Sequence, residues 1–163
     1  MNSESTVDET AHRGSIESPL PGIYFGFDFG TKRIGIAKGH TETQSASPLT
    51  VIRNINDRPD WERLDTLISV WLPVGLIVGL PLSDQGNPQI LSAQSNAFAK
   101  KIGKRYSLPV HRCDERYSSI EASKVLAQHR QLGIRQRKVQ RSHTDEMAAA
   151  IILENWLCGT MNL

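Results

Sequence analysis

The stretch 23-IYFGFDFGTKRIGIAK-38 decides the fold of this chain. Two runs rich in β-branched and aromatic residues, 23–29 and 33–38, flank the short turn Gly30-Thr31-Lys32 and predict two strands. A third apolar run, 49–53, follows a turn-rich segment around 39–48. Because the connections are short, we expect the three strands to form an antiparallel meander.

The pattern of apolar residues changes after the meander. Apolar residues at helical spacing predict a helix from Trp61 to Leu72, which Pro59-Asp60 would start. The continuous apolar run 74–80 predicts a strand that is covered on both faces. Further along, we expect a helix at 90–106, a strand at 110–114 and helices at 118–130 and 142–157. This order predicts one three-layer α/β domain, with a mixed five-stranded sheet and helices on both faces.

The composition narrows the class of protein. A chain of 163 residues with 39% hydrophobic residues can build one core. The sequence has no apolar run long enough to span a membrane and no secretory signal, so we expect a cytoplasmic protein without a membrane partner. The two cysteines, Cys113 and Cys158, lie far apart in no metal-ligand spacing.

The charge is unevenly distributed along the chain. Residues 1–20 carry four acids and one arginine, a net charge of −3. Since the whole chain has a net charge of +2, the other 143 residues have a net charge of +5. We expect residues 1–20 to be a disordered acidic extension and residues 21–163 to be the folded domain. A basic domain behind an acidic tail hints at a polyanionic partner, although an ordinary solvated surface explains this modest charge equally well.

Asp28 is the first candidate for chemistry because it lies within an apolar strand. A buried carboxylate without a partner costs several kcal/mol, so Asp28 needs a cation, hydrogen-bond donors or a raised pKa. The alternative is a structural Asp that is hydrogen-bonded to the amides of the Gly30 turn.

Two more acids stand at the ends of predicted elements. Glu115 follows the strand 110–114, at a strand end where ligands often collect, but a salt bridge with Arg116 is the alternative. Asp145 begins a stripe with Ala149, Ile152 and Trp156 on one face of the last helix. The spacing from Ser142 to Asp145 also fits a capping box, so ligand and cap remain open.

If these three carboxylates converge, they form a site for hard divalent cations. Mg²⁺ and Mn²⁺ take oxygen ligands, and two such ions would activate a water and stabilise the leaving oxygen in phosphodiester cleavage. We therefore predict Asp28, Glu115 and Asp145 as catalytic residues and as ligands of Mg²⁺ or Mn²⁺, two ions in the expected case.

A nucleic-acid substrate is favoured by clustered basic residues. The segment 129–143 contains five Lys or Arg residues and no acid, and such a segment binds phosphate. The predicted nucleic-acid-binding residues are Lys32, Arg33, Arg116, Arg130, Arg135, Arg137, Lys138 and Arg141.

Four motifs in order resemble the YqgF (RuvX-type) family. They are Gly26-Phe-Asp-Phe-Gly-Thr-Lys-Arg-Ile-Gly35, Val78-Gly-Leu-Pro-Leu82 with Gly86, Asp114-Glu-Arg116, and Asp145 before Ala148-Ala149. The resemblance covers about residues 22–158. It implies an RNase H-like fold related to Holliday-junction resolvases, and it places the catalytic acids at Asp28, Glu115 and Asp145. This chain departs from the family at Tyr117-Ser118-Ser119, where Leu-Thr-Thr is usual, and in its acidic extension.

The resemblance predicts a metal-dependent endonuclease that acts on structured RNA, with 5′-end processing of pre-16S rRNA in ribosome biogenesis as the expected role. The alternative substrate is branched DNA, cut by a Holliday-junction resolvase. Pre-ribosomal particles are a candidate partner, and the chain is expected to be a monomer or a homodimer.

Two other classes remain open from the sequence. Asp28-Phe-Gly-Thr31 also resembles the phosphate loop of actin-like ATPases and sugar kinases, and ATP binding would support that class. A nucleic-acid-binding module without catalysis is the other alternative, and it predicts that Asp28→Asn leaves function intact.

Overall fold

The computed structural model describes residues 18–80, 88–114 and 141–161. The predicted helix at 118–130 and the acidic extension up to residue 17 lie outside these ranges. Along the chain the elements are β1 (Ile23–Phe29), β2 (Arg33–His40), β3 (Ser45–Ile55), β4 (Arg58–Pro59), α1 (Trp61–Trp71), β5 (Gly75–Leu80), α2 (Pro88–Tyr106), β6 (Val110–Asp114) and α4 (Arg141–Met161).

The strands form one mixed sheet in the order β4-β3-β2-β1-β5-β6. β1, β2, β3 and β4 pair with antiparallel neighbours, which confirms the predicted meander. β5 and β6 add parallel strands beside β1, so these three strands end at the same edge of the sheet. That shared edge is where the domain can gather side chains from separate strands.

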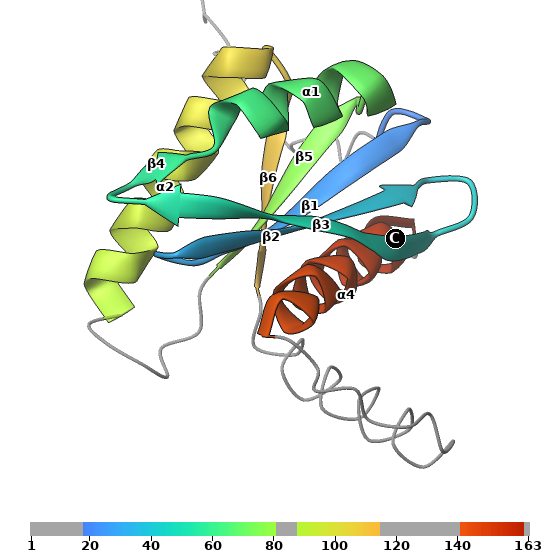
Figure 1. Cartoon of the computed structure of the whole chain (residues 1–163). Coiled ribbons are helices and arrows are strands. Elements are labelled where there is room, and N and C mark those ends of the chain that lie inside the picture. The colour runs from blue at the N-terminus through green and yellow to red at the C-terminus, as the bar shows by residue number, and fades with distance from the viewer. Residues whose placement is uncertain (1–17, 81–87, 115–140, 162–163) are drawn as a thin grey trace, which may run out of the picture.

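Helices cover both faces of the sheet, as predicted. α1 and α2 lie on one face and α4 lies on the other (Figure 1). The first face holds an apolar core around Phe25, Phe27 and Phe98, and the second holds a core of Tyr24, Ile77 and residues of α4. This arrangement is the three-layer α/β architecture that the element order indicates.

Gly26 lets α4 lie close to the sheet. A Cβ atom at this position would lie 2.7 Å from the Cβ of Leu153 and 2.9 Å from the carbonyl oxygen of Ala149. The predicted stripe on α4 does pack against the sheet, because Ala149 and Ile152 are buried and Trp156 packs against the same core. The start of α4 is thereby held next to the middle strands.

The β2–β3 hairpin is longer than predicted. Both strands continue past the expected bounds and leave only residues 41–44 as the turn. Pro48 indicated a loop, but it lies in β3 next to a register shift, where Ile36 pairs with Thr50 and Ala37 with Pro48. A bulge accommodates a residue that cannot donate a backbone hydrogen bond.

β4 is a sixth strand that the sequence pattern did not predict. Its two residues, Arg58 and Pro59, pair with the end of β3. The turn residues Asn56 and Asp57 both have positive φ, 50° and 57°, which is typical of a tight type I′ hairpin. The strand is too short for an alternation pattern, but this Asn-Asp pair was a usable signal.

α1 begins as predicted. Asp60 is its N-cap, and its side chain accepts a hydrogen bond from the Arg63 amide. Leu72 ends the helix in the left-handed region with φ 48°. In the described ranges, no helix has the length and apolar character needed to cross a membrane.

Candidate active site

Asp28 lies on the α4 face of the sheet, close to the end of β1. Alternation along β1 sends Phe27 and Phe29 into the core under α1 and α2, so Asp28 faces α4. Its partner across the β1–β2 ladder is Gly35. The side chain is half-buried, and no described residue donates a hydrogen bond to its carboxylate. The alternative of a structural Asp held by turn amides therefore finds no support.

The environment of Asp28 favours its protonated form. Burial, and next the negative charge of Asp145, raise the pKa of Asp28 from 3.8 to about 7. Ionisation of a carboxyl group with this pKa costs free energy, and a nearby cation would lower that cost. The direction is the one expected for a carboxyl group that binds a cation.

Asp145 reaches the same place from α4. A Cβ atom at Gly35 would collide with the Asp145 carbonyl oxygen, so the helix rests directly on this glycine. Because Asp28 pairs with Gly35, the two acids are neighbours, which agrees with the effect of Asp145 on Asp28. The helix begins at Arg141, which makes Asp145 its fifth residue and places it beyond the first turn. Asp145 therefore does not occupy a helix-cap position.

Arg33 completes the described part of the cluster. Its Nε donates to Asp145 Oδ2 at 2.9 Å, and both side chains are partly exposed. The guanidinium thus orients one carboxylate at the edge of the site. The structure shows Arg33 bound to an acid, and its predicted binding of phosphate stays a prediction.

Glu115, the third predicted acid, lies outside the described residues. β6 ends at Asp114, at the same sheet edge as β1 and β5. Along β6, Arg112 donates to Ser95 of α2, whereas His111 lies 5.0 Å from the Trp156 ring of α4 and Cys113 packs on that side. Arg112 and Cys113 thus face opposite sides of the sheet, as alternation along a strand requires.

The donor set suits a hard divalent cation. Two neighbouring carboxylates, one of them with a raised pKa, provide the oxygen ligands that Mg²⁺ or Mn²⁺ prefers. Within the described ranges, no group of three or more His, Cys, Asp or Glu side chains is close enough to hold a metal ion. The described residues alone therefore do not make a metal site, and Asp28 and Asp145 would supply at most two of its ligands.

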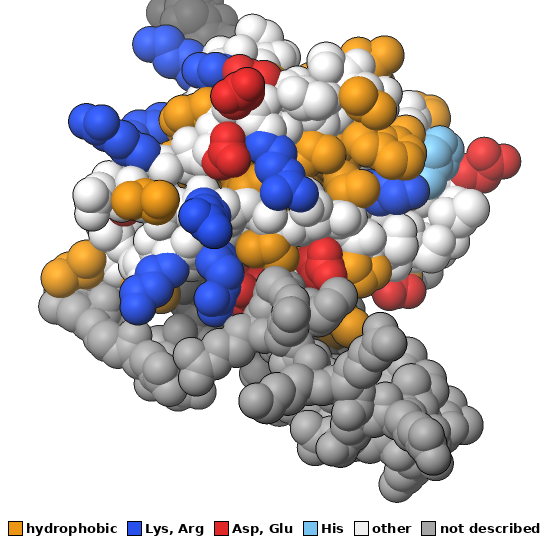
Figure 2. All heavy atoms as spheres, in the orientation of Figure 1, with side chains coloured by type: hydrophobic (Ala, Val, Ile, Leu, Met, Phe, Trp, Pro, Cys, Tyr) orange, Lys and Arg blue, Asp and Glu red, His pale blue; other side chains and the backbone are white. Residues whose placement is uncertain are grey.

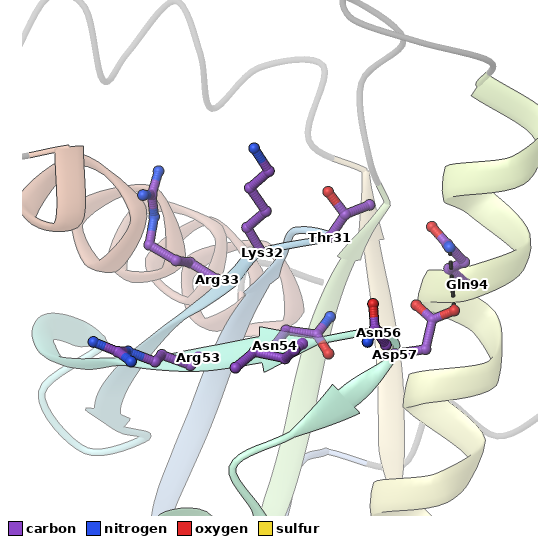
Figure 3. A pocket seen from close by; sticks show the side chains of 9 residues that line it. Thr31, Lys32, Arg33, Arg53, Asn54, Asn56, Asp57 and Gln94 are labelled. Atoms are coloured by element: carbon purple, nitrogen blue, oxygen red, sulfur yellow. Dashed lines mark hydrogen bonds between the residues drawn. The ribbon is translucent and has the colours of Figure 1, made fainter.

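A groove of about 780 Å³, lined mostly by polar side chains, lies beside Arg33, which contacts Asp145; Figure 3 shows the lining. Its lining residues come from the β1–β2 turn, the β3–β4 hairpin and α2, and they are Thr31, Lys32, Arg33, Arg53, Asn54, Ile55, Asn56, Asp57 and Gln94. Lys and Arg side chains gather over this end of the sheet, at the lower left of Figure 2. Sequence reasoning found Lys32 and Arg33 but missed the residues from β3 and α2.

The remaining predicted nucleic-acid-binding residues are not placed by the structure. Arg116, Arg130, Arg135, Arg137 and Lys138 lie outside the described residues. Arg141 is the first residue of α4, and only its backbone is described.

Comparison with known proteins connects this geometry to a family. The model of the RuvX family, described as "Holliday junction resolvase", matches residues 22–159. A relative from Legionella pneumophila subsp. pneumophila, named "Putative pre-16S rRNA nuclease", is 45% identical over 136 residues, which are 83% of this chain and 95% of the relative. A relative of the same name from Azotobacter vinelandii is 41% identical over 138 residues, covering 84% of this chain and 94% of the relative.

Solved structures support the fold. The RuvC protein of T. thermophilus, in complex with a Holliday junction substrate, aligns with a TM-score of 0.54 at 16% identity, covering 86% of this chain and 96% of that chain. The yeast mitochondrial Holliday junction resolvase aligns with a TM-score of 0.54 at 13% identity, covering 90% of this chain and 82% of that chain. The fold prediction is confirmed, and the family match covers nearly all of the predicted domain: this chain belongs to the RuvX family.

Proposed function

We propose that this chain is a divalent-metal-dependent endonuclease that hydrolyses phosphodiester bonds in structured RNA, and that its role is 5′-end processing of pre-16S rRNA in the cytoplasm. The observation that carries the proposal is the half-buried Asp28, which has no described donor and lies beside Asp145 with its pKa raised to about 7. Holding two carboxylates close together costs electrostatic free energy, and a cation bound between them would account for this arrangement. The names of the relatives supply the substrate class.

Asp28 and Asp145 would hold Mg²⁺ or Mn²⁺, with Glu115 as the third ligand. If the alternation of β6 continued one residue past Asp114, that position would face α4, as Asp28 does. The bound ions would supply an activated water and charge stabilisation for the leaving oxygen. Arg33 keeps the Asp145 carboxylate oriented, and Lys32 stands next to it to bind backbone phosphate.

The closest alternative substrate is branched DNA. The description of the family favours this substrate. The similar structure solved with a Holliday junction has low sequence identity to this chain, so it supports the fold alone. The same acids would serve either substrate, because both contain the same phosphodiester. A binding module without catalysis is less consistent with the site, since two carboxylates without a metal ion repel phosphate.

The test is a cleavage assay with the full chain. The protein is incubated with Mg²⁺ or Mn²⁺ and either a labelled pre-rRNA leader or a labelled four-way DNA junction. We expect cleavage of the RNA that stops in EDTA and falls at least about 100-fold in Asp28→Asn, since even an outer-shell partner of a metal ligand costs about 10–100-fold. Glu154→Gln, an exposed acid on α4, is the matched control and should cut normally.

Each other outcome has a definite meaning. Cleavage of the junction alone would establish the resolvase. Binding of both substrates without cleavage of either, unchanged in Asp28→Asn, would establish the non-catalytic module. ATP binding by the chain would revive the resemblance to actin-like ATPases.

A further inference from the structure

The polar groove next to the acids is continuous with the candidate active site. Arg33 lines the groove and also donates to Asp145, so a single side chain borders both sites. The floor is tied to the turn that follows Asp28, because the buried Asn54 donates from Nδ2 to the Gly30 carbonyl oxygen at 2.9 Å. A strand of substrate at the acids that crosses this turn would enter the groove directly.

The charges that line the groove are arranged for an anion. Arg33 and Arg53 are direct partners in the β2–β3 ladder and therefore share one face of the sheet. Like charges in this arrangement destabilise a sheet, whereas an anion bound beside them would stabilise them. In the part of the chain that the structure describes, Arg33 has an acidic partner, whereas no ion pair is formed by Lys32 or Arg53. The one acid in the lining, Asp57, accepts a hydrogen bond from Gln94.

The size and polarity of the groove fit a chain of nucleotides better than a single ion. A groove of about 780 Å³ can hold a ligand much larger than a phosphate ion. Eight of its nine lining residues carry polar or charged side chains, which suits a polyanionic chain.

We propose that this groove binds the phosphodiester strand that flanks the cleavage site, with Lys32 and Arg53 contacting its phosphates. The inference rests on the proposed function for the identity of the ligand, and it adds a second contact region on β3 that extends the site away from the acids. Binding there requires no metal ion, because the contacts are made by cationic side chains. RNA and DNA share this backbone chemistry.

The experiment measures binding separately from cleavage. Fluorescence anisotropy of labelled single-stranded RNA and DNA of the same sequence is recorded in EDTA, across a salt series, with the full chain. For Arg53→Gln we expect an affinity about fivefold weaker at 0.1 M salt and a salt slope smaller by about 0.7, the value for one lost phosphate contact on a single strand. The same variant should melt no lower than the wild type, because it removes one of two opposed like charges.

Arg58→Gln is the matched control. Arg58 lies on the same hairpin, is exposed and carries the same charge, but it does not line the groove. It should bind like the wild type. Arg53→Lys, which keeps the charge, should retain most of the affinity. If wild-type RNA binding is tighter than DNA binding, RNA is the natural strand, and the reverse order assigns DNA.

The proposal is overturned if Arg53→Gln binds as tightly as the wild type with an unchanged slope, or if Arg58→Gln weakens binding equally. These outcomes are distinct from failure of the nuclease. A chain that binds through Arg53 but never cleaves with metal would keep the groove and lose the proposed function. A chain that cleaves normally without Arg53 would keep the function and lose the groove.

Discussion

Alanine at position 35 would test how the two acids are brought together. The added methyl group would collide with the backbone carbonyl of Asp145, and it would also lie 2.9 Å from the Glu146 amide nitrogen. Neither obstacle is a flexible side chain, so α4 must move away from β2. Overpacking of this kind costs about 1–3 kcal/mol. At about 2–4 °C per kcal/mol for a chain of this size, the melting temperature should fall by about 2–12 °C.

The catalytic effect should exceed the effect on stability. A displacement of about 1 Å in a reacting group can cost about 100-fold in rate, and the Gly35 collision displaces the start of α4 by a distance of this order. Metal-dependent cleavage measured at 25 °C, well below the melting transition, should therefore fall about 100-fold while circular dichroism shows a folded protein. Calorimetry gives the change in melting temperature on the same samples.

Gly159→Ala provides the matched control. Gly159 lies on α4 too, but a Cβ atom there meets no other atom within 4 Å. Alanine in a helix is favoured by about 1 kcal/mol over glycine, so this variant should be as stable as the wild type or slightly more stable, with normal cleavage. Wild-type stability and activity in Gly35→Ala would refute the idea that Gly35 sets the distance between Asp28 and Asp145.

Three further predictions concern the charged groups. The folded-state pKa of Asp28 is about 7, above its unfolded value of 3.8, so the metal-free protein should lose stability as the pH rises from about 4 through 7. Thermal melting of Asp28→Asn should therefore occur at a higher temperature than that of the wild type at pH 8, but not at pH 4. Mg²⁺ or Mn²⁺ should raise the melting temperature of the wild type and have little effect on Asp28→Asn, and a metal-blind wild type would argue against a metal site. Asp65 accepts hydrogen bonds from Arg105, its main partner, and from Tyr106, and these lower its pKa to about 2. Asp65→Asn should therefore melt lower than the wild type above pH 4, and a thermal-melting series should show this difference shrinking as the pH falls from 4 through 2.

Local patterns predicted the elements that build the site. The strand 23–29 and the strand 110–114 have the predicted bounds, and Asp60 starts α1 as expected. Asp28 was identifiable because a carboxylate in an apolar strand conflicts with its surroundings, and such a conflict is typical of a functional position. Asp145 was identifiable as the head of an apolar helical stripe, although a cap explained it equally well until the start of the helix was known.

The residues that sequence reasoning missed depend on contacts between distant segments. Arg53 becomes the neighbour of Arg33 only through the register of the β2–β3 ladder, and a bulge near Pro48 shifts that register. Gln94 joins the groove because α2 packs beside the β3–β4 hairpin, and its hydrogen bond to Asp57 spans 37 residues. No periodicity within one segment contains this information. The Asn56-Asp57 pair was the one local signal for the hairpin that brings these residues together.

The close packing of α4 on the sheet explains why the fold tolerates two neighbouring acids. Asp28 and Asp145 repel each other when both are charged, and the metal-free chain has only Arg33 beside them among the described residues. A longer separation would relieve the repulsion, but α4 is held close by the packing of Leu153 on Gly26 and of its backbone on Gly35. The apolar contacts of α4 thus offset an electrostatic cost at its N-terminal end. Because a cation between the two carboxylates would remove this cost, the close packing is what the proposed metal-dependent nuclease would require.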